Sequence, residues 1–268
     1  MICLCNVAHI SWKRLPVNEK TWIFTYFVEC NATDYLCVTC NPLKVKRFFR
    51  NQPESVCVKI CGIRNEAEAE AAIASGADAL GFNLYPGSKR FVDLRCEKNW
   101  IRQLRTDISR IAVLVNPPIN DVLGLIEDDT FDAIQFHGDE LPEFFEMIPP
   151  NSKPLIKAFR MRDRATLKDA GSYPVFAFLL DSYRDGVFGG TGECFDWKIM
   201  KQVTLNKPVL LAGGLTAENV GEAVRMFRPH AVDVASGVEN REGRKEEHKI
   251  REFVQAAKLA ISRERKED

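Results

Sequence analysis

Two reactive side chains stand at the ends of apolar runs in this sequence. Cys61 ends the run VKIC, with Lys59 two residues earlier, and Asp181 ends the run FLLD. A nearby ammonium favours the thiolate, which can act as a base, and partly apolar surroundings suit a carboxyl group that acts as an acid. The two residues therefore predict acid–base chemistry. The alternatives are that Cys61 only fills a buried gap and that Asp181 only forms a turn.

Small residues follow two later apolar runs. Gly213 and Gly214 come after LLA, and Ser236 and Gly237 come after DVA. Glycine lets backbone N–H groups approach phosphate oxygens closely, and the start of a short helix adds a favourable dipole. The pattern predicts a phosphate site, although paired glycines also form ordinary turns.

Two further polar residues follow apolar runs. Arg90 lies in YPGSKRF and His137 in IQFHGDE. An arginine can grip a carboxylate with two parallel hydrogen bonds, which a lysine cannot do, although a loop arginine can also be a solvated charge. A lone histidine is more often structural than catalytic, and no second ligand at a suitable spacing indicates a metal.

Regular alternation of strands and helices is expected to position these residues. From residue 56 onward, eight short β-branched or apolar runs alternate with eight helix-like runs. The expected strands are Val56–Cys61, Ala79–Phe82, Ile111–Val115, Ala133–Phe136, Leu155–Phe159, Val175–Leu180, Val209–Leu211 and Ala231–Val234. The expected helices include Glu66–Ala74, Asn120–Glu127, Ala217–Phe227 and Lys245–Ser262. This pattern predicts a (β/α)8 TIM barrel; a doubly wound sheet is the alternative, but no G-x-G-x-x-G follows the first strand.

The barrel would gather the candidate residues at one face, because barrel chemistry occurs at the carboxyl ends of the strands. Alternation along the first strand puts Val56, Val58 and Ile60 on one side and Cys57, Lys59 and Cys61 on the other. The aliphatic side should face the helices. Lys59 and Cys61 are therefore expected to point into the barrel.

Residues 1–55 differ in character from residues 56–268, the predicted catalytic domain. All sixteen glycines lie from Gly62 onward, and five of the nine cysteines lie before residue 55. The first segment shows neither helical nor strand periodicity, and we expect an extension that contributes little to function. Cys37 and Cys40, with Cys30 and His9, could suggest zinc, but the second pair of a zinc ribbon is missing.

The composition of the chain indicates which classes of binding partner to expect. The 37 basic residues balance 37 acidic ones, so we expect neither nucleic acid nor a membrane surface as a partner. A small molecule is the expected partner. The apolar runs are far shorter than the ~20 residues of a membrane span, and no leader pattern opens the chain. The irregularly spaced cysteines are expected to be free thiols in a reducing compartment. These features predict a cytoplasmic protein.

Several motifs in order resemble one enzyme family. VKICGIRN, GADALGFNLYPGSKRFV, IQFHGDE, LLDS followed by GGTGECFDW, LLAGGLTAENV and AVDVASGVE together resemble phosphoribosylanthranilate isomerase of tryptophan biosynthesis, over roughly residues 56 to 259. The resemblance implies the Amadori rearrangement of a phosphorylated aminoaldose, N-(5-phosphoribosyl)anthranilate, to 1-(2-carboxyphenylamino)-1-deoxyribulose 5-phosphate. It also implies that neither a cofactor nor a metal is needed.

The resemblance also implies residue roles. Asp181 would protonate the ribose ring oxygen, Cys61 would take the proton from C2, and Arg90 would bind the anthranilate carboxylate. Backbone amides of Gly213, Gly214, Ser236 and Gly237 would hold the phosphate. Asp233 is expected among the substrate-binding residues, and Lys59 and His137 are expected in supporting roles. The related histidine-pathway isomerase resembles this family but uses an aspartate as base, so Cys61 argues against it. A catalytically silent barrel that serves as a binding module is the other alternative.

Overall fold

The computed structural model describes residues 10–18, 21–28, 48, 56–105, 107–150, 152–161, 164–182, 205–241 and 243–262. The chain divides into two compact units, Met1–Val38 and Thr39–Asp268. In the first unit, strands β1 (Ile10–Asn18) and β2 (Thr21–Val28) form an antiparallel pair. This segment shows no clear strand periodicity, although TWIFTYFV is rich in the aromatic and β-branched residues that favour strands.

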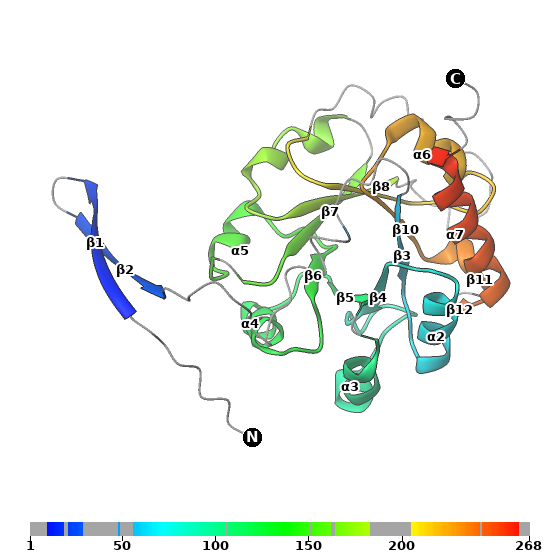
Figure 1. The fold of residues 1–268 in the computed structure, drawn as a ribbon, viewed down its shortest axis with the longest axis horizontal. Coiled ribbons are helices and arrows are strands. Elements are labelled where there is room, and N and C mark those ends of the chain that lie inside the picture. The colour runs from blue at the N-terminus through cyan, green and yellow to red at the C-terminus, as the bar shows by residue number, and fades with distance from the viewer. Residues whose placement is uncertain are drawn as a thin grey trace. The chain divides into compact units, whose positions relative to one another are not determined.

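The second unit contains a closed barrel of eight parallel strands (Figure 1). The strands are β3 (Cys57–Cys61), β4 (Ala79–Asn83), β5 (Ser109–Leu114), β6 (Ala133–Phe136), β7 (Leu155–Met161), β8 (Ala177–Ser182), β9 (Val209–Ala212) and β10 (Ala231–Val234). Each strand pairs with the next along the chain, and β10 closes the ring on β3, with Asp233 opposite Lys59. The predicted TIM barrel is confirmed.

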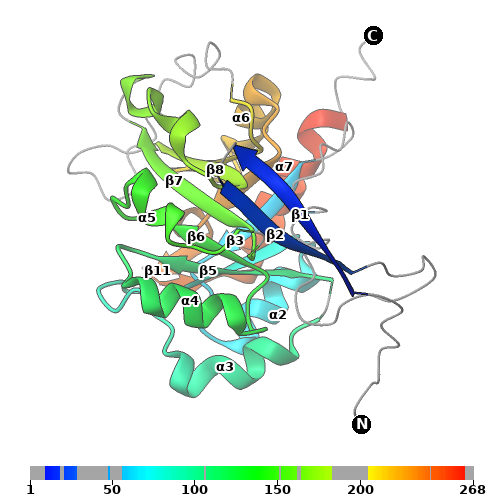
Figure 2. The same cartoon turned by 90° about the vertical axis from the view of Figure 1, so that its left-hand side faces the viewer.

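Helices surround the ring of strands, as Figures 1 and 2 show. They are α2 (Glu66–Ala74), α3 (Leu94–Gln103), α4 (Ile119–Glu127), α5 (Pro142–Glu146), α6 (Val220–Phe227) and α7 (Glu247–Ser262). After β7, the expected helix is replaced by two 3-10 turns, Arg164–Leu167 and Ala170–Ser172. Gly171 and Pro174 break a longer helix in this stretch. Residues 183–204, between β8 and β9, lie outside the described part.

The two sides of β3 face as predicted. Val56, Val58 and Ile60 belong to the hydrophobic layer between strands and helices, which also contains Phe253 of α7. Cys57 instead belongs to the cluster inside the barrel. The alternation of the strand therefore directs Lys59 and Cys61 inward, as expected.

Phe48 lies among the residues that fill the barrel interior, although it precedes the expected start of the barrel. Its side chain is 3% exposed and packs in the cluster that includes Cys57, Ala79, Ala133 and Ala231. These four small residues stand at or next to the first positions of their strands, so they leave volume at the amino-terminal end of the barrel. The ring of Phe48 fills part of this space.

Candidate active site

A buried ion pair lies inside the barrel below Cys61. Lys59 Nζ donates a hydrogen bond to Asp233 Oδ1 at 2.8 Å, and the two side chains are 0% and 7% exposed. Register explains the contact, because Lys59 of β3 and Asp233 of β10 are direct neighbours. The structure therefore shows Asp233 as the partner of Lys59, and direct contact of Asp233 with a substrate stays a prediction.

Cys61 is the last residue of β3; the residue as a whole is partly exposed, while its thiol is buried. Burial raises the pKa of this thiol; the charge of Lys59 lowers the pKa, and that of Asp233 raises it again. The net pKa is above the ordinary value of 9.0. Lys59 thus acts in the predicted direction, but burial outweighs it, so the resting group is a thiol.

Gly81 of β4 leaves the space that Cys61 and Lys59 occupy. It pairs with Cys61 across the strands, and a Cβ at Gly81 would lie 2.9 Å from both Cys61 Sγ and Lys59 Nζ. Real Cβ atoms do not approach other atoms so closely. A larger residue at Gly81 would therefore displace the thiol or the ammonium.

Asp181 is the next-to-last residue of β8, and its carboxylate contacts His137. His137 Nε2 lies 3.2 Å from Asp181 Oδ2, while Gln135 Nε2 lies 3.2 Å from His137 Nδ1. With the NH2 group of Gln135 donating to Nδ1, the neutral imidazole carries its proton on Nε2 and donates it to Asp181. Asp181 is about one quarter exposed, at 27%. The histidine therefore orients a carboxylate that remains open to solvent.

A second buried ion pair fixes the loop that carries His137. Lys157 Nζ donates to Glu140 Oε2 at 2.6 Å and to the Gly138 carbonyl at 2.8 Å, and both charged side chains are 3% exposed or less. Glu140 also accepts hydrogen bonds from the backbone N–H groups of Asn116 and Gly138. The loop after β6 is thus held by several charge-assisted hydrogen bonds.

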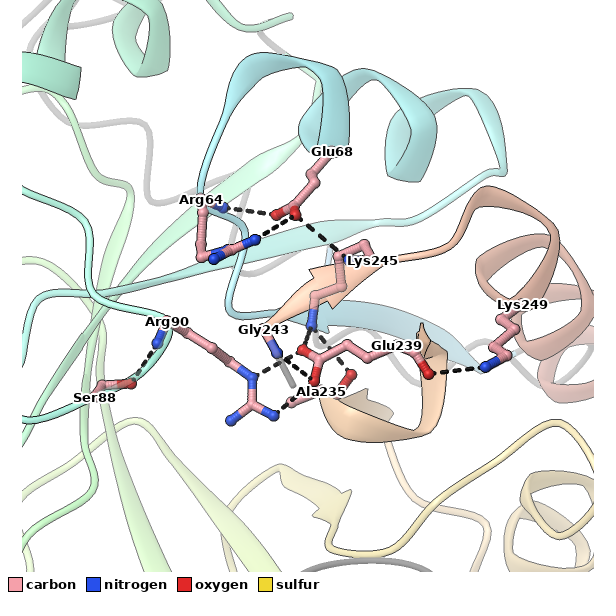
Figure 3. Close-up of polar contacts among 9 residues, drawn as sticks. All are labelled: Arg64, Glu68, Ser88, Arg90, Ala235, Glu239, Gly243, Lys245 and Lys249. Carbon is pink, nitrogen blue, oxygen red and sulfur yellow. Dashed lines mark hydrogen bonds and ion pairs between the residues drawn. The ribbon is translucent and has the colours of Figure 1, made fainter. Parts of the chain in front are cut away.

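Arg90 is held in a bidentate ion pair. Its Nε and Nη2 atoms each lie 2.8 Å from a carboxylate oxygen of Glu239 (Figure 3). Its side chain also crosses the backbone at Gly62, where a Cβ would overlap Arg90 Cδ. Arg90 therefore lies next to the residue that follows Cys61. A carboxylate bound by Arg90 would share the guanidinium with Glu239.

The two loops predicted to bind phosphate pack against each other. Gly213 and Gly214 follow β9 with φ angles of 86° and 62°, which favour glycine. Ser236 and Gly237 begin a 3-10 turn after β10. A Cβ at Gly237 would overlap the carbonyl oxygen of Leu215, so glycine is needed where the loops meet. Ser236 and Gly214 are exposed, as a phosphate site requires.

Four residues at the site were not predicted from the sequence: Glu239, Lys245, Gln135 and Gly81. Glu239 ends the motif AVDVASGVE, but its link to Arg90 joins residues 149 positions apart. Lys245 was expected to begin the last helix, which starts at Glu247. Gln135 shares the strand side of His137, so alternation could have found it.

The described residues contain no group of three His, Cys, Asp or Glu side chains that could hold a metal, and Cys30, Cys37, Cys40 and His9 lie outside them. Among the helices in the described part, none is long and apolar enough to cross a membrane.

Relatives of known sequence match the barrel region. The family model for N-(5'phosphoribosyl)anthranilate (PRA) isomerase matches residues 58–256. The N-(5'-phosphoribosyl)anthranilate isomerase of Syntrophomonas wolfei is 42% identical over 198 residues, which are 74% of this chain and 95% of the relative. That of Caldanaerobacter subterraneus is 40% identical over 204 residues, 76% of this chain and 98% of the relative.

Solved structures match the same region. Phosphoribosyl anthranilate isomerase from Thermotoga maritima superposes with a TM-score of 0.68 at 35% identity, over 76% of this chain and 98% of that one. A phosphoribosyl anthranilate isomerase in complex with reduced 1-(o-carboxyphenylamino)-1-deoxyribulose 5-phosphate gives a TM-score of 0.67, also at 35% identity and with the same coverage of both chains. Because sequence and structure agree over the whole barrel and cover each relative almost completely, the chain belongs to the N-(5'-phosphoribosyl)anthranilate isomerase family.

Proposed function

We propose that this barrel isomerises N-(5'-phosphoribosyl)anthranilate, the activity of its family, with Asp181 as the acid and Cys61 as the base. One observation carries this assignment: Cys61 is the last residue of β3 and Asp181 the next-to-last residue of β8, in one closed barrel. All strands run parallel, so both residues lie at the same mouth. The order of the strands places β9 and β10 between them, so a substrate can lie between the two groups.

Ring opening is the first step. Asp181 in its protonated form gives its proton to the ribose ring oxygen while the bond between this oxygen and C1 breaks, which leaves a protonated Schiff base between C1 and the anthranilate nitrogen. Asp181 becomes a carboxylate. The Nε2–H of His137, 3.2 Å from Asp181 Oδ2, supports this negative charge.

Proton transfer from carbon is the second step. The thiolate of Cys61 takes the proton from C2, and the electrons of the C–H bond form the double bond between C1 and C2 of an enolamine. The enolamine gains a proton at C1 from solvent and releases the proton of its C2 hydroxyl to solvent, which gives the ketone. Exchange with solvent then returns a proton to Asp181 and removes one from Cys61. A high thiol pKa makes the thiolate a strong base but a sparsely populated one at neutral pH.

The two ends of the substrate have separate binding groups. Arg90 is assigned to the anthranilate carboxylate, because a guanidinium matches a carboxylate in geometry and charge. The phosphate is assigned to the backbone amides of Gly213, Gly214, Ser236 and Gly237. The contact between the two glycine loops supports this, since it brings both sets of amides to one place.

A cytoplasmic location is also proposed. In the described part of the chain, Cys57, Cys61 and Cys96 are free thiols. Free thiols persist in a reducing compartment, and a basic thiol at the site needs to stay reduced.

Turnover of phosphoribosylanthranilate by the purified protein tests the proposal, followed through loss of substrate fluorescence. We expect turnover by the wild type and its loss in Cys61→Ala and in Asp181→Asn. A folded wild type without turnover would favour a silent barrel or a different aminoaldose. Full turnover by either variant would show that its residue is not the acid or the base.

A further inference from the structure

Glu239 is a buried carboxylate on which four donors converge. Besides Nε and Nη2 of Arg90, it accepts hydrogen bonds from Lys245 Nζ at 2.6 Å and from the Gly243 N–H at 3.0 Å (Figure 3). Its side chain is 3% exposed. Burial raises its pKa, but Arg90 and Lys245 outweigh burial and lower the pKa to about 2. Glu239 is therefore ionised at every pH at which the enzyme would work.

Arg90 is fixed on two sides. Glu239 occupies the Nε and Nη2 edge of the guanidinium, and the alkyl part of the side chain lies against Gly62. A guanidinium has five N–H donors, of which Glu239 takes two. The side chain of Arg90 is 22% exposed, so it is not fully enclosed. An approaching carboxylate meets a guanidinium whose plane is already set.

Lys245 connects Glu239 to the loop that follows β10. Its Nζ donates to the Ala235 carbonyl at 3.0 Å, immediately before Ser236, and the side chain is 1% exposed. The positive charge of Lys245 also lowers the pKa of Cys61. Glu239 thus contacts two cations. One is Arg90, which is assigned to the substrate carboxylate, and the other is Lys245, which lies beside the predicted phosphate loop and influences the thiol of Cys61.

We propose that Glu239 is the positioning residue of the substrate-carboxylate site, which acts by orienting the guanidinium of Arg90. This inference rests on the proposed function, because it assumes that Arg90 binds the anthranilate carboxylate. Glu239 lies in β11 (Glu239–Arg241), directly after the 3-10 turn Ser236–Val238. The carboxylate and phosphate ends of the substrate are therefore positioned by one continuous segment.

The variant Glu239→Gln removes the charge at nearly constant shape. A glutamine has one acceptor oxygen and a donor NH2 group, so it cannot satisfy the same four donors. We expect KM for phosphoribosylanthranilate to rise about tenfold, because the substrate carboxylate meets a poorly oriented arginine. We expect kcat to change by less than about threefold, because the acid and the base are untouched.

Asp132→Asn is the matched control. Asp132 holds Arg110 in a similarly buried carboxylate–guanidinium pair, at 5% and 11% exposure, at the opposite, amino-terminal end of the strands. Its loss should reduce stability without raising KM. Glu239→Asp is the second variant if Glu239→Gln does not fold: it keeps the negative charge but shortens the reach to Arg90, so KM should still rise.

A double-mutant cycle with Arg90→Met separates positioning from mere stability. If Glu239 acts through Arg90, the double variant should have the KM of Arg90→Met alone. The proposal would be overturned if the KM increases of the two single variants multiplied in the double variant. An unchanged KM in Glu239→Gln or Glu239→Asp would also overturn it.

Calorimetry with reduced 1-(o-carboxyphenylamino)-1-deoxyribulose 5-phosphate and its anilino counterpart, which lacks the carboxylate, gives a readout that does not need turnover. Wild type should prefer the carboxylated compound, and Glu239→Gln should lose this preference. Unchanged preference in Glu239→Gln would refute the inference alone, whereas no turnover and no binding by wild type would refute the proposed function.

Discussion

Replacement of Asp233 by asparagine should strongly destabilise the protein. Lys59 is 0% exposed, and its Nζ has Asp233 Oδ1 as a partner at 2.8 Å. Removal of the carboxylate leaves a buried ammonium without its counter-charge, which costs about 3–5 kcal/mol. The cost has an upper bound, because Lys59 can instead lose its proton. With an ordinary lysine pKa of about 10.4 and about 1.36 kcal/mol per unit, this costs about 4.6 kcal/mol at pH 7.

The same reasoning predicts a pH dependence with a definite sign. Burial lowers the pKa of Lys59, but the charges and hydrogen bonds of Asp233 and Cys61 together outweigh burial, and the net pKa is raised. The wild type therefore keeps this stabilisation up to the pKa of a lysine in the unfolded chain and loses it above. In Asp233→Asn the folded pKa falls below the unfolded one, so stability of the variant increases with pH. The difference between the two proteins should shrink by up to about 1.4 kcal/mol per pH unit.

Equilibrium unfolding in urea at pH 7 and pH 9 measures both effects. Asp107→Asn is the control, because Asp107 pairs with Arg105 at the surface, where both are more than 60% exposed, and its loss should change stability little. A loss below about 1 kcal/mol in Asp233→Asn at pH 7 would refute the reasoning, because that is the range of exposed pairs. An equal loss at both pH values would refute the assignment to Lys59.

Three further variants test other parts of the structure. Gly62→Ala places a Cβ at a φ of 79° and against Arg90, so we expect a stability loss of about 1–2 kcal/mol and a raised KM. Urea unfolding and steady-state kinetics check it; unchanged values of both would contradict the contact. Phe48→Ala should cost about 3–5 kcal/mol, because it opens a cavity inside the barrel. Thermal unfolding measures this, and an unchanged midpoint would place Phe48 outside the core. Gly237→Ala should weaken inorganic phosphate binding, measured by calorimetry, because the added Cβ separates the loop from Leu215. Equal affinity in both proteins would argue against a phosphate site there.

Most of the barrel could be predicted from its sequence, because each strand is a short apolar run followed by a polar or glycine residue. Ala133–Phe136, Ala231–Val234 and Glu66–Ala74 have their predicted bounds. Asn65 explains why α2 begins where it does, because its side chain accepts a hydrogen bond from the Glu68 N–H. A helix was expected after β7 because the composition of this stretch is otherwise helical. Gly171 and Pro174 interrupt that composition, and two 3-10 turns form instead.

The positions of the site residues were predictable, but their partners were not. Strand alternation and parallel pairing directed Lys59 inward and opposite β10. The contacts of Arg90 with Glu239 and of Asp181 with His137 join loops or strands far apart in the sequence. Such pairs depend on how the barrel closes, and no local pattern reveals them.

The amino-terminal segment differs most from the expectation. It contains the β1–β2 hairpin, and Phe48 reaches the barrel interior. Removal of residues 1–38 should therefore leave the barrel intact, whereas removal of residues 1–54 also takes away a core side chain. A comparison of the two truncations by thermal unfolding would show this difference.

The pH dependence of kcat/KM in the wild type, Cys61→Ala and Cys61→Asp most directly tests the central claim, that Cys61 is the base. The raised thiol pKa predicts that wild-type activity rises with pH toward and beyond 9. An aspartate, with an ordinary pKa of about 3.9, is already ionised at neutral pH, so Cys61→Asp should lose this basic limb. Cys61→Ala should lack turnover at every pH. Turnover by Cys61→Ala, or the wild-type limb unchanged in Cys61→Asp, would contradict the account.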